Sequence, residues 1–144
     1  MAGRPRVRAV VARARDTTRF DAPARANRCG GGLGVLLRGT RAGDGVAVWL
    51  RTPDTLTSGA WPLLQRADTL SARGAVVGVR FMVGDGAHGV ALDSGAVTVT
   101  RGDNTLAVAA KGTGFETVAG RVAVDVSSDP VPLDRDTVSC RRRL

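Results

Sequence analysis

The only histidine of the chain, His88, stands in a glycine-rich segment with acidic residues and a serine nearby. A hydrolytic triad needs a histidine that can reach both a nucleophile and an acid, and Ser94 and Asp85 are the nearest candidates in the sequence. Ser94 lacks the G-x-S-x-G elbow that exposes a nucleophilic serine. Because a lone histidine without a marked partner is weak support for catalysis, we expect no catalytic residue and keep His88 as a candidate binding residue.

The same segment, Gly84–Gly89, matches the glycine pattern G-x-G-x-x-G of dinucleotide-binding proteins. In those proteins a helix follows the glycines, since the pyrophosphate lies on the N-terminus of that helix. Here the next residues, Val90–Gly95, predict a strand and a turn. We therefore interpret Gly84–Gly89 as the loop of a hairpin and expect no nucleotide cofactor.

Metal-ligating residues are sparse. Three carboxylates gather at Asp129, Asp134 and Asp136, but the spacing of a calcium loop is absent and Arg135 interrupts the group. A structural zinc site needs four ligands, and the chain offers only two cysteines and one histidine. We expect no metal and no other cofactor.

The two cysteines, Cys29 and Cys140, stand at opposite edges of the central part of the chain. We expect them to form a disulfide that ties the ends of that part together, the alternative being two unpaired thiols. Closing a loop of about 100 residues stabilises a fold by roughly 4.7 kcal/mol in the chain-entropy model. Such a bridge would place the protein in an oxidising compartment.

Positive charge is concentrated at the ends. The formal net charge is +8. Residues 1–28 hold eight arginines and two aspartates, and Arg141, Arg142 and Arg143 follow Cys140, whereas residues 29–140 are close to neutral. An arginine-rich end can bind a polyanion through salt-dependent phosphate contacts. This gives an alternative function, polyanion or nucleic-acid binding through the termini, although nucleic acid is the less expected partner.

Residues 1–28 allow several interpretations: a disordered arm, a transit-like peptide, or a start that lacks an export signal, since no signal peptide is present in the chain as given. The alternation of Val7, Ala9 and Val11 with polar neighbours also permits a first strand. Trp49 and Trp61 are further binding candidates, because an exposed indole can stack on a sugar or enter a protein interface. Core packing is the alternative for at least one of them.

Between the glycine-rich turns the chain has the residue alternation of β-strands. The predicted strands are Leu33–Arg38, Gly45–Arg51, Ala60–Gln65, Gly74–Val83, Gly89–Leu92, Ala96–Arg101, Thr105–Lys111 and Val118–Val126. We expect turns at Asp93–Gly95, Gly102–Asn104 and Gly112–Gly114, one helical turn within residues 66–73, and an extended coil from Ser127 to Ser139.

This spacing predicts an all-β fold with little helix, either an antiparallel β-sandwich or a partly closed β-barrel of about eight to nine short strands. We divide the chain into an arginine-rich arm or first strand (1–28), a single β-domain (29–140) and a basic tail (141–144). No run of 18 apolar residues is present, so we expect no transmembrane segment.

The body of the chain resembles the small all-β domains of bacterial secreted and envelope proteins of unknown function. The resemblance is carried by Cys29 near the start, Val46–Arg51, Thr57–Pro62 and Asp93–Thr100. It implies an exported β-domain and no particular site residues. Together these features predict a non-enzymatic extracytoplasmic domain with a binding or structural role, whose partner is an envelope protein or a glycan.

Overall fold

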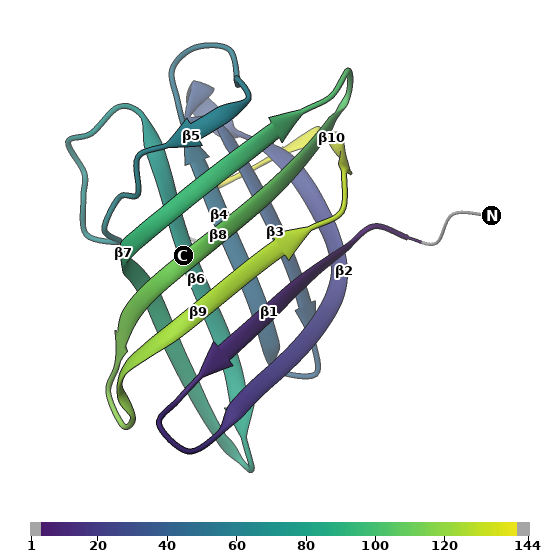
Figure 1. Cartoon of the computed structure of the whole chain (residues 1–144). Coiled ribbons are helices and arrows are strands. Elements are labelled where there is room, and N and C mark those ends of the chain that lie inside the picture. Colours follow the sequence, from purple (N-terminus) through teal and green to yellow (C-terminus); the bar gives the residue numbers. More distant parts are fainter. Residues whose placement is uncertain (1–3, 141–144) are drawn as a thin grey trace.

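In the computed structural model, which describes residues 4–140, eight strands close into an antiparallel β-barrel and two further strands extend its wall (Figure 1). The barrel order is β1-β2-β3-β4-β6-β7-β8-β9, and β9 returns to β1. The strands are β1 (Arg6–Ala12), β2 (Thr17–Cys29), β3 (Val35–Arg41), β4 (Asp44–Arg51), β5 (Gly59–Trp61), β6 (Gly74–Val83), β7 (Gly86–Arg101), β8 (Thr105–Glu116), β9 (Gly120–Ser128) and β10 (Val131–Val138). The predicted all-β class is confirmed, with a closed barrel as its form.

The barrel closes between the first and the ninth strand. In the antiparallel pair β1–β9, Val7 lies opposite Ser128 and Ala12 lies opposite Ala123. Residues 6–28 are therefore part of the barrel wall, as β1, the turn after it and β2. The alternating residues Val7, Ala9 and Val11 form the inward face of β1.

The two additional strands, β5 and β10, pair with parts of barrel strands that extend beyond their neighbours in the barrel. β2 pairs with β1 over its first half only, and β10 lies parallel to its second half, with Leu133 opposite Ala26. At its other side β10 reaches β8, where Val131 lies opposite Leu106. In a similar way, the short strand β5 pairs with the second half of β7, beyond the residues that pair with β6.

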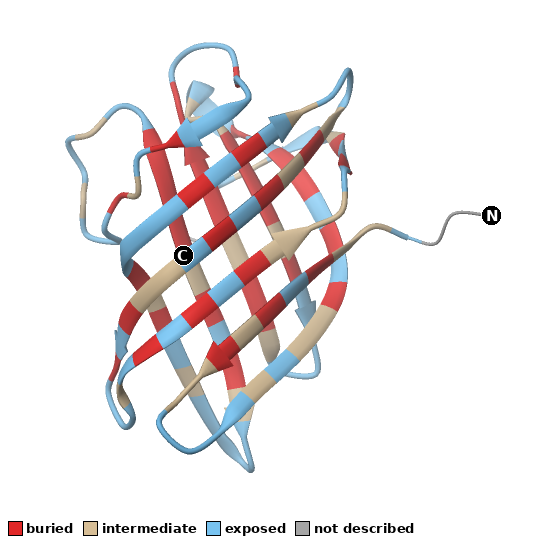
Figure 2. Cartoon of the chain, in the orientation of Figure 1, coloured by how far each residue is buried: buried red, intermediate tan, exposed pale blue. Residues whose placement is uncertain are grey.

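Along much of the barrel strands, buried residues alternate with more exposed ones (Figure 2). The buried set forms the core, because alternate side chains of a strand point to the same face. On β4 the inward residues are Val46, Val48 and Leu50. On β6 they include Val77, Val79 and Phe81, of which Phe81 has no exposed surface. The barrel interior is thus packed mainly with aliphatic side chains, together with the aromatic rings of Phe81 and Trp61.

A second hydrophobic cluster lies on the outside of the barrel. The expected disulfide is present: Cys29 and Cys140 are joined, with their Cα atoms 5.5 Å apart. The bridge packs with outward-facing residues of β3, β4 and β6 and with the loop that follows β5. These residues are Leu36, Trp49, Leu64 and Val76. The disulfide therefore attaches the end of the chain after β10 to the outer wall.

Two expected turns are absent, because β7 and β8 run through them as long, bent strands. The register shifts between Leu92 and Ser94, which marks a β-bulge. Gly95 and Gly112 lie opposite each other, and a Cβ on Gly95 would collide with the carbonyl of Lys111. These glycines let two strands bend at a barrel corner without ending, which alternation alone does not distinguish from a turn.

Other boundaries also differ from the prediction. The segment Ser127–Ser139 was expected to be coil, but most of it forms β10, since its backbone pairs with β2. The helical turn expected within 66–73 is a single hydrogen-bonded turn in which Asp68 N donates to Gln65 O. The hairpin at Gly102–Asn104 is confirmed, with Gly102 N donating to Thr105 O at 3.0 Å.

Within residues 4–140 the only helical element is the 3-10 turn η1 (Gly30–Gly32), and no helix is long and apolar enough to cross a membrane.

Candidate functional site

Both tryptophans are buried. Trp49 is 5% exposed, and its indole N–H donates to Leu33 O at 2.8 Å. Trp61 is 4% exposed, belongs to the barrel core and donates to Thr57 O at 3.0 Å. Arg51 lies over the Trp49 ring at 4.4 Å and Arg73 over the Trp61 ring at 4.2 Å. Neither indole offers an open ring face to a ligand.

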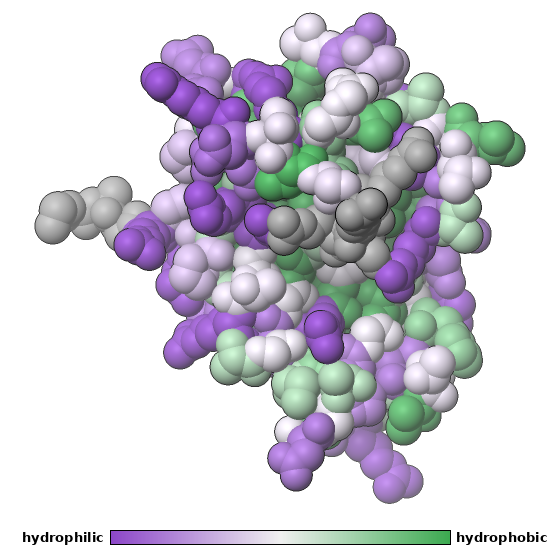
Figure 3. Space-filling model, turned by 180° about the vertical axis from the view of Figure 1, so that it is seen from behind, coloured by the Kyte–Doolittle hydropathy of each residue, from purple (hydrophilic) through white to green (hydrophobic). Residues whose placement is uncertain are grey.

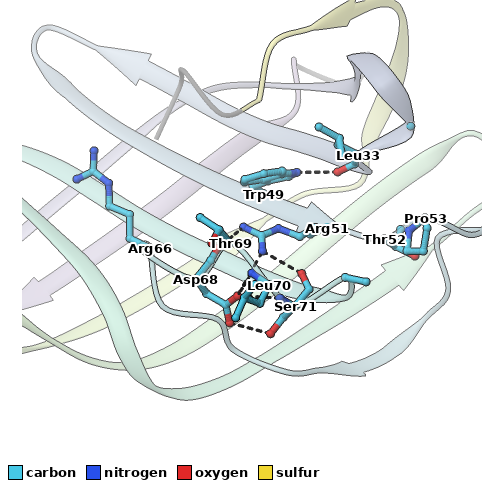
Figure 4. Close-up of a pocket in the computed structure, with 12 residues that line it drawn as sticks. Leu33, Trp49, Arg51, Thr52, Pro53, Arg66, Asp68, Thr69, Leu70 and Ser71 are labelled. Atoms are coloured by element: carbon cyan, nitrogen blue, oxygen red, sulfur yellow. Dashed lines mark hydrogen bonds and ion pairs between the residues drawn. The ribbon is translucent and has the colours of Figure 1, made fainter.

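Arg51 fastens the loop after β5 to the barrel wall (Figure 4). Its guanidinium donates to Ser71 O and to Asp68 O, each at 2.9 Å. Asp68 in turn accepts the backbone N–H and the hydroxyl of Ser71, and these hydrogen bonds lower the pKa of its carboxyl. The recess of about 420 Å³ beside this cluster is lined by Trp49, Leu33 and the loop. Because the loop itself uses the guanidinium of Arg51, the cluster is best explained as a structural anchor.

His88 points into the barrel, where its partner is Glu116. His88 Nδ1 lies 2.9 Å from Glu116 Oε1, and the imidazole stacks on Phe81. Glu116 is 2% exposed and also accepts the backbone N–H groups of Val118 and Ala119. The hydrogen bond from His88, followed by the one from Ala119, holds the pKa of the Glu116 carboxyl below its ordinary value. The structure therefore pairs His88 with Glu116 and gives it no hydrogen bond to Asp85 or Ser94 among the described residues.

Glu116 could not be found from the sequence while Gly112–Gly114 was interpreted as a turn. In the structure β8 continues through these glycines, and Glu116 therefore lies on its inward face with Leu106, Val108 and Ala110. The buried histidine–carboxylate pair fixes the turn between β8 and β9, since both oxygens of Glu116 accept hydrogen bonds. Its hydrogen bonds fit a structural pair at one end of the barrel.

A groove of about 750 Å³ runs across the outer face of β3, β4, β6 and β7. We call it the outer groove. Its floor follows from the strand register, which aligns Arg38 with Ala47, Ala47 with Gly78 and Gly78 with Ala91. At the centre of this row, nothing lies within 4 Å of the position that a Cβ of Gly78 would occupy. The outward positions there carry small side chains or none, so the sheet face is hollow.

Larger side chains surround this floor. Phe115 of β8 is 59% exposed and lines one end, at the opposite end of the groove from Arg38. Adjacent strands are about 4.8 Å apart, so the four steps from β3 to β8 span about 19 Å along the wall. Arg80 on β6 and Arg66 on the loop after β5 are exposed and line the remaining sides. Figure 3 shows this side of the molecule, where hydrophobic and near-neutral residues lie among hydrophilic ones that are most numerous at the upper left.

The outer groove is electropositive. The described residues that line it include Arg38, Arg66 and Arg80 and no aspartate or glutamate. Several N-terminal arginines are bound to carboxylates elsewhere on the barrel. Arg6 pairs with Asp21 at 3.0 Å, Arg8 with Asp129 at 3.0 Å and Arg25 with Asp134 at 2.9 Å.

These ion pairs change the interpretation of the N-terminal charge. Hydrogen bonds from the arginines lower the pKa of the carboxyl of each of the three aspartates. Two of them, Asp129 and Asp134, belong to the carboxylate group that the sequence singled out. These two carboxylates are therefore paired with arginines, and no cluster of metal-ligating residues is found in the described part of the chain. Arg141, Arg142 and Arg143 lie outside the described residues.

The sequence did not single out Arg66, Gly78, Arg80 or Phe115. A signal was available on the predicted strands: Ala47 and Gly78 take outward positions of two strands whose inward positions carry valines. What the sequence alone does not give is the register that places them side by side. No family model, curated protein or solved structure matches this chain.

Proposed function

We propose that this chain is a non-enzymatic extracytoplasmic β-barrel domain that binds its ligand in the outer groove. The main observation behind this proposal is the open floor at Gly78, which leaves a hollow of about 750 Å³ in the barrel wall. Pockets that take small ligands have volumes of about 300–1,000 Å³, so the groove has room for one small ligand or a short segment of a larger one.

The packed interior of the barrel favours the outer groove as the binding site. Its inward side chains form one continuous cluster from β1 to β10, which includes Trp61 at 4% exposure and Phe81 with no exposed surface. A ligand inside the barrel would have to displace that core, and interiors at native packing density hold few spaces larger than a water molecule. The outer groove needs no such rearrangement.

The disulfide supports the extracytoplasmic location. Bonds between cysteines persist in oxidising compartments and are rare in the cytosol, and the bridge joins residues 111 positions apart. Intact mass after thiol alkylation tests this. We expect no alkylation of the protein isolated from its native compartment until a reductant is added, and rapid alkylation without reductant would contradict the location.

The proposal of a non-enzymatic role rests on the surroundings of His88. Its ring is held between Phe81 and Glu116 Oε1. The other carboxylate oxygen of Glu116, Oε2, accepts backbone N–H groups of the turn after β8. General-base catalysis requires the base to reach the proton of a substrate or nucleophile. Here the described hydrogen bonds of the ring lead only to Glu116.

The alternative, polyanion binding through the termini, has less support from the structure, since Arg6, Arg8 and Arg25 are paired with aspartates. A chain that ends at Cys140 distinguishes the two proposals. If the groove is the site, this chain keeps full affinity for its ligand. If the arginine-rich tail is the site, affinity for a polyanion falls and its dependence on salt becomes weaker.

Filling the floor tests the groove itself. The variant Gly78→Val places a side chain in open space on a strand, where a β-branched residue is favoured. Its control is Ala109→Val, at an exposed outward position of β8 away from the groove. Binding of soluble glycans and small metabolites is screened by shifts in thermal unfolding. We expect every ligand found with the wild type to be lost in Gly78→Val and kept in Ala109→Val; equal binding by both variants would overturn the proposal.

A further inference from the structure

We infer that the ligand of the outer groove is a short acidic oligosaccharide, a chain of sugar rings that carries carboxylate or sulfate groups. This inference rests on the proposed function, because it names the ligand class for the same groove. It combines three properties of the groove: the positive charge of its lining residues, its flat floor of alanine and glycine, and the pairing of its strands, which leaves no free backbone N–H or C=O groups along it.

The positive charge of the lining residues favours an anionic ligand. Arg66 and Arg80 are exposed at the sides of the groove, and no carboxylate is found among its described lining residues. A guanidinium presents a planar fork of N–H donors that matches a carboxylate or a sulfate. Two such groups, one on the loop after β5 and one on β6, favour a ligand with more than one anionic group over a single small anion.

The flat row of small residues on the floor favours a ligand whose rings can lie on it. Ala47, Gly78 and Ala91 form one row across three strands, and Gly45 and Gly89 lie in the neighbouring row beside Arg80. A sugar ring has one face of C–H groups, which can lie on such a floor and against the ring of Phe115. Aromatic side chains with an apolar face suit this contact, and Phe115 is 59% exposed at the end of the groove. Thr40, which also lines the groove, offers a hydroxyl to the sugar.

A peptide fits the groove less well. Extended peptides bind sheets by adding a strand to a free edge, where the backbone pairs. The groove crosses the middle of a wall: β4 pairs with both β3 and β6, and β6 pairs with both β4 and β7. The backbone groups of these strands are therefore already used, and an acidic peptide would find no partners for its own.

Single-stranded nucleic acid also fits less well. Proteins that bind it stack successive bases on several aromatic rings. In the described part of the chain, Phe115 is the only large exposed aromatic residue. The floor of the groove offers alanine and glycine instead, so the aromatic series that nucleic acid requires is missing.

The test measures calorimetric affinity for two acidic probes, tetragalacturonate and a heparin-derived tetrasaccharide, which separate carboxylate from sulfate recognition. The carboxyl-reduced form of tetragalacturonate is the neutral control. We expect one acidic probe to bind and the neutral form to bind at least tenfold more weakly. The double variant Arg66→Gln/Arg80→Gln should lose at least tenfold in affinity for that probe. The control variant Arg19→Gln/Arg135→Gln, at exposed arginines outside the groove, should bind as the wild type does.

The outcomes separate this inference from the proposed function. If the neutral and acidic probes bind equally, or if the two arginine variants bind equally, the charge argument is wrong, while loss of binding in Gly78→Val would still support the groove. Tighter groove binding by hexaglutamate or an oligonucleotide would assign another ligand class and overturn the inference. If no acidic probe binds the wild type at millimolar concentration, the inference fails; the proposed function then depends on the wider ligand screen.

Discussion

Removing the Cys29–Cys140 bridge should destabilise the barrel by an amount that its loop length sets. The chain-entropy model gives a loss of about 4.8 kcal/mol at 25 °C for a closed loop of about 111 residues. For a chain of this size, 1 kcal/mol corresponds to a shift of roughly 2–4 °C in the unfolding temperature. We therefore expect the reduced protein to unfold roughly 10–20 °C below the oxidised one.

The assay is equilibrium unfolding in urea, with the oxidised wild type compared with wild type refolded under reductant. Both samples have the same side chains, so the difference isolates the bond. The variant Cys29→Ala/Cys140→Ala should lose slightly more, because the two sulfur atoms pack with Leu36 and Trp49 in the outer cluster. If the oxidised and reduced wild type differ by less than about 1 kcal/mol, the loop-entropy reasoning does not describe this protein.

Further predictions concern the buried pair, the loop anchor and the glycines. Because the folded pKa of Glu116 is depressed, its contribution to stability is complete above the ordinary carboxyl pKa and is lost as pH falls through the folded value; urea midpoints below about pH 4.5 should fall more steeply in the wild type than in Glu116→Gln. Arg51→Lys cannot bridge two carbonyls at once, so we expect a loss of about 1–2 kcal/mol and faster proteolysis in the loop at Ser71, and equal cleavage rates would contradict the anchor role. Gly112→Ala should destabilise by more than 2 kcal/mol, because its Cβ would collide with the carbonyl of Ser94. Gly78→Ala should instead be neutral or stabilising by up to about 1 kcal/mol, since that position is open; chemical denaturation of the two alanine variants checks the contrast.

The sequence was most informative where one face of a strand is aliphatic. Val46, Val48 and Leu50 share one face of β4, and Val77 and Val79 share one face of β6. This grouping follows from the alternation within the predicted strands, because period-2 alternation is a local property. Strand ends were less well predicted around Gly95 and Gly112, where the same glycine chemistry serves a bend within a strand and a turn between strands.

The candidate site could be predicted only in part. The disulfide followed from the placement of two cysteines, and it is present. The outer groove depends on which strands are neighbours and in what register, and strand pairing across 30 or more residues is not encoded in any local pattern. Trp49 illustrates the limit: the sequence left its exposure open, because its burial depends on Leu64 and on Cys140, both distant in sequence.

The pairing of β1 with β9 has a consequence for how the protein is made. Val7 and Ser128 are opposite each other in the closed wall although 121 positions separate them in the chain. While the ribosome is still making the protein, β1 can form a hairpin with β2 but has no partner on its other side until β9 has emerged. Such long-range pairing slows folding and leaves unpaired edges exposed in the meantime. The barrel can therefore close only after β9 has emerged, and shortened chains that lack β9 would present two open sheet edges to one another.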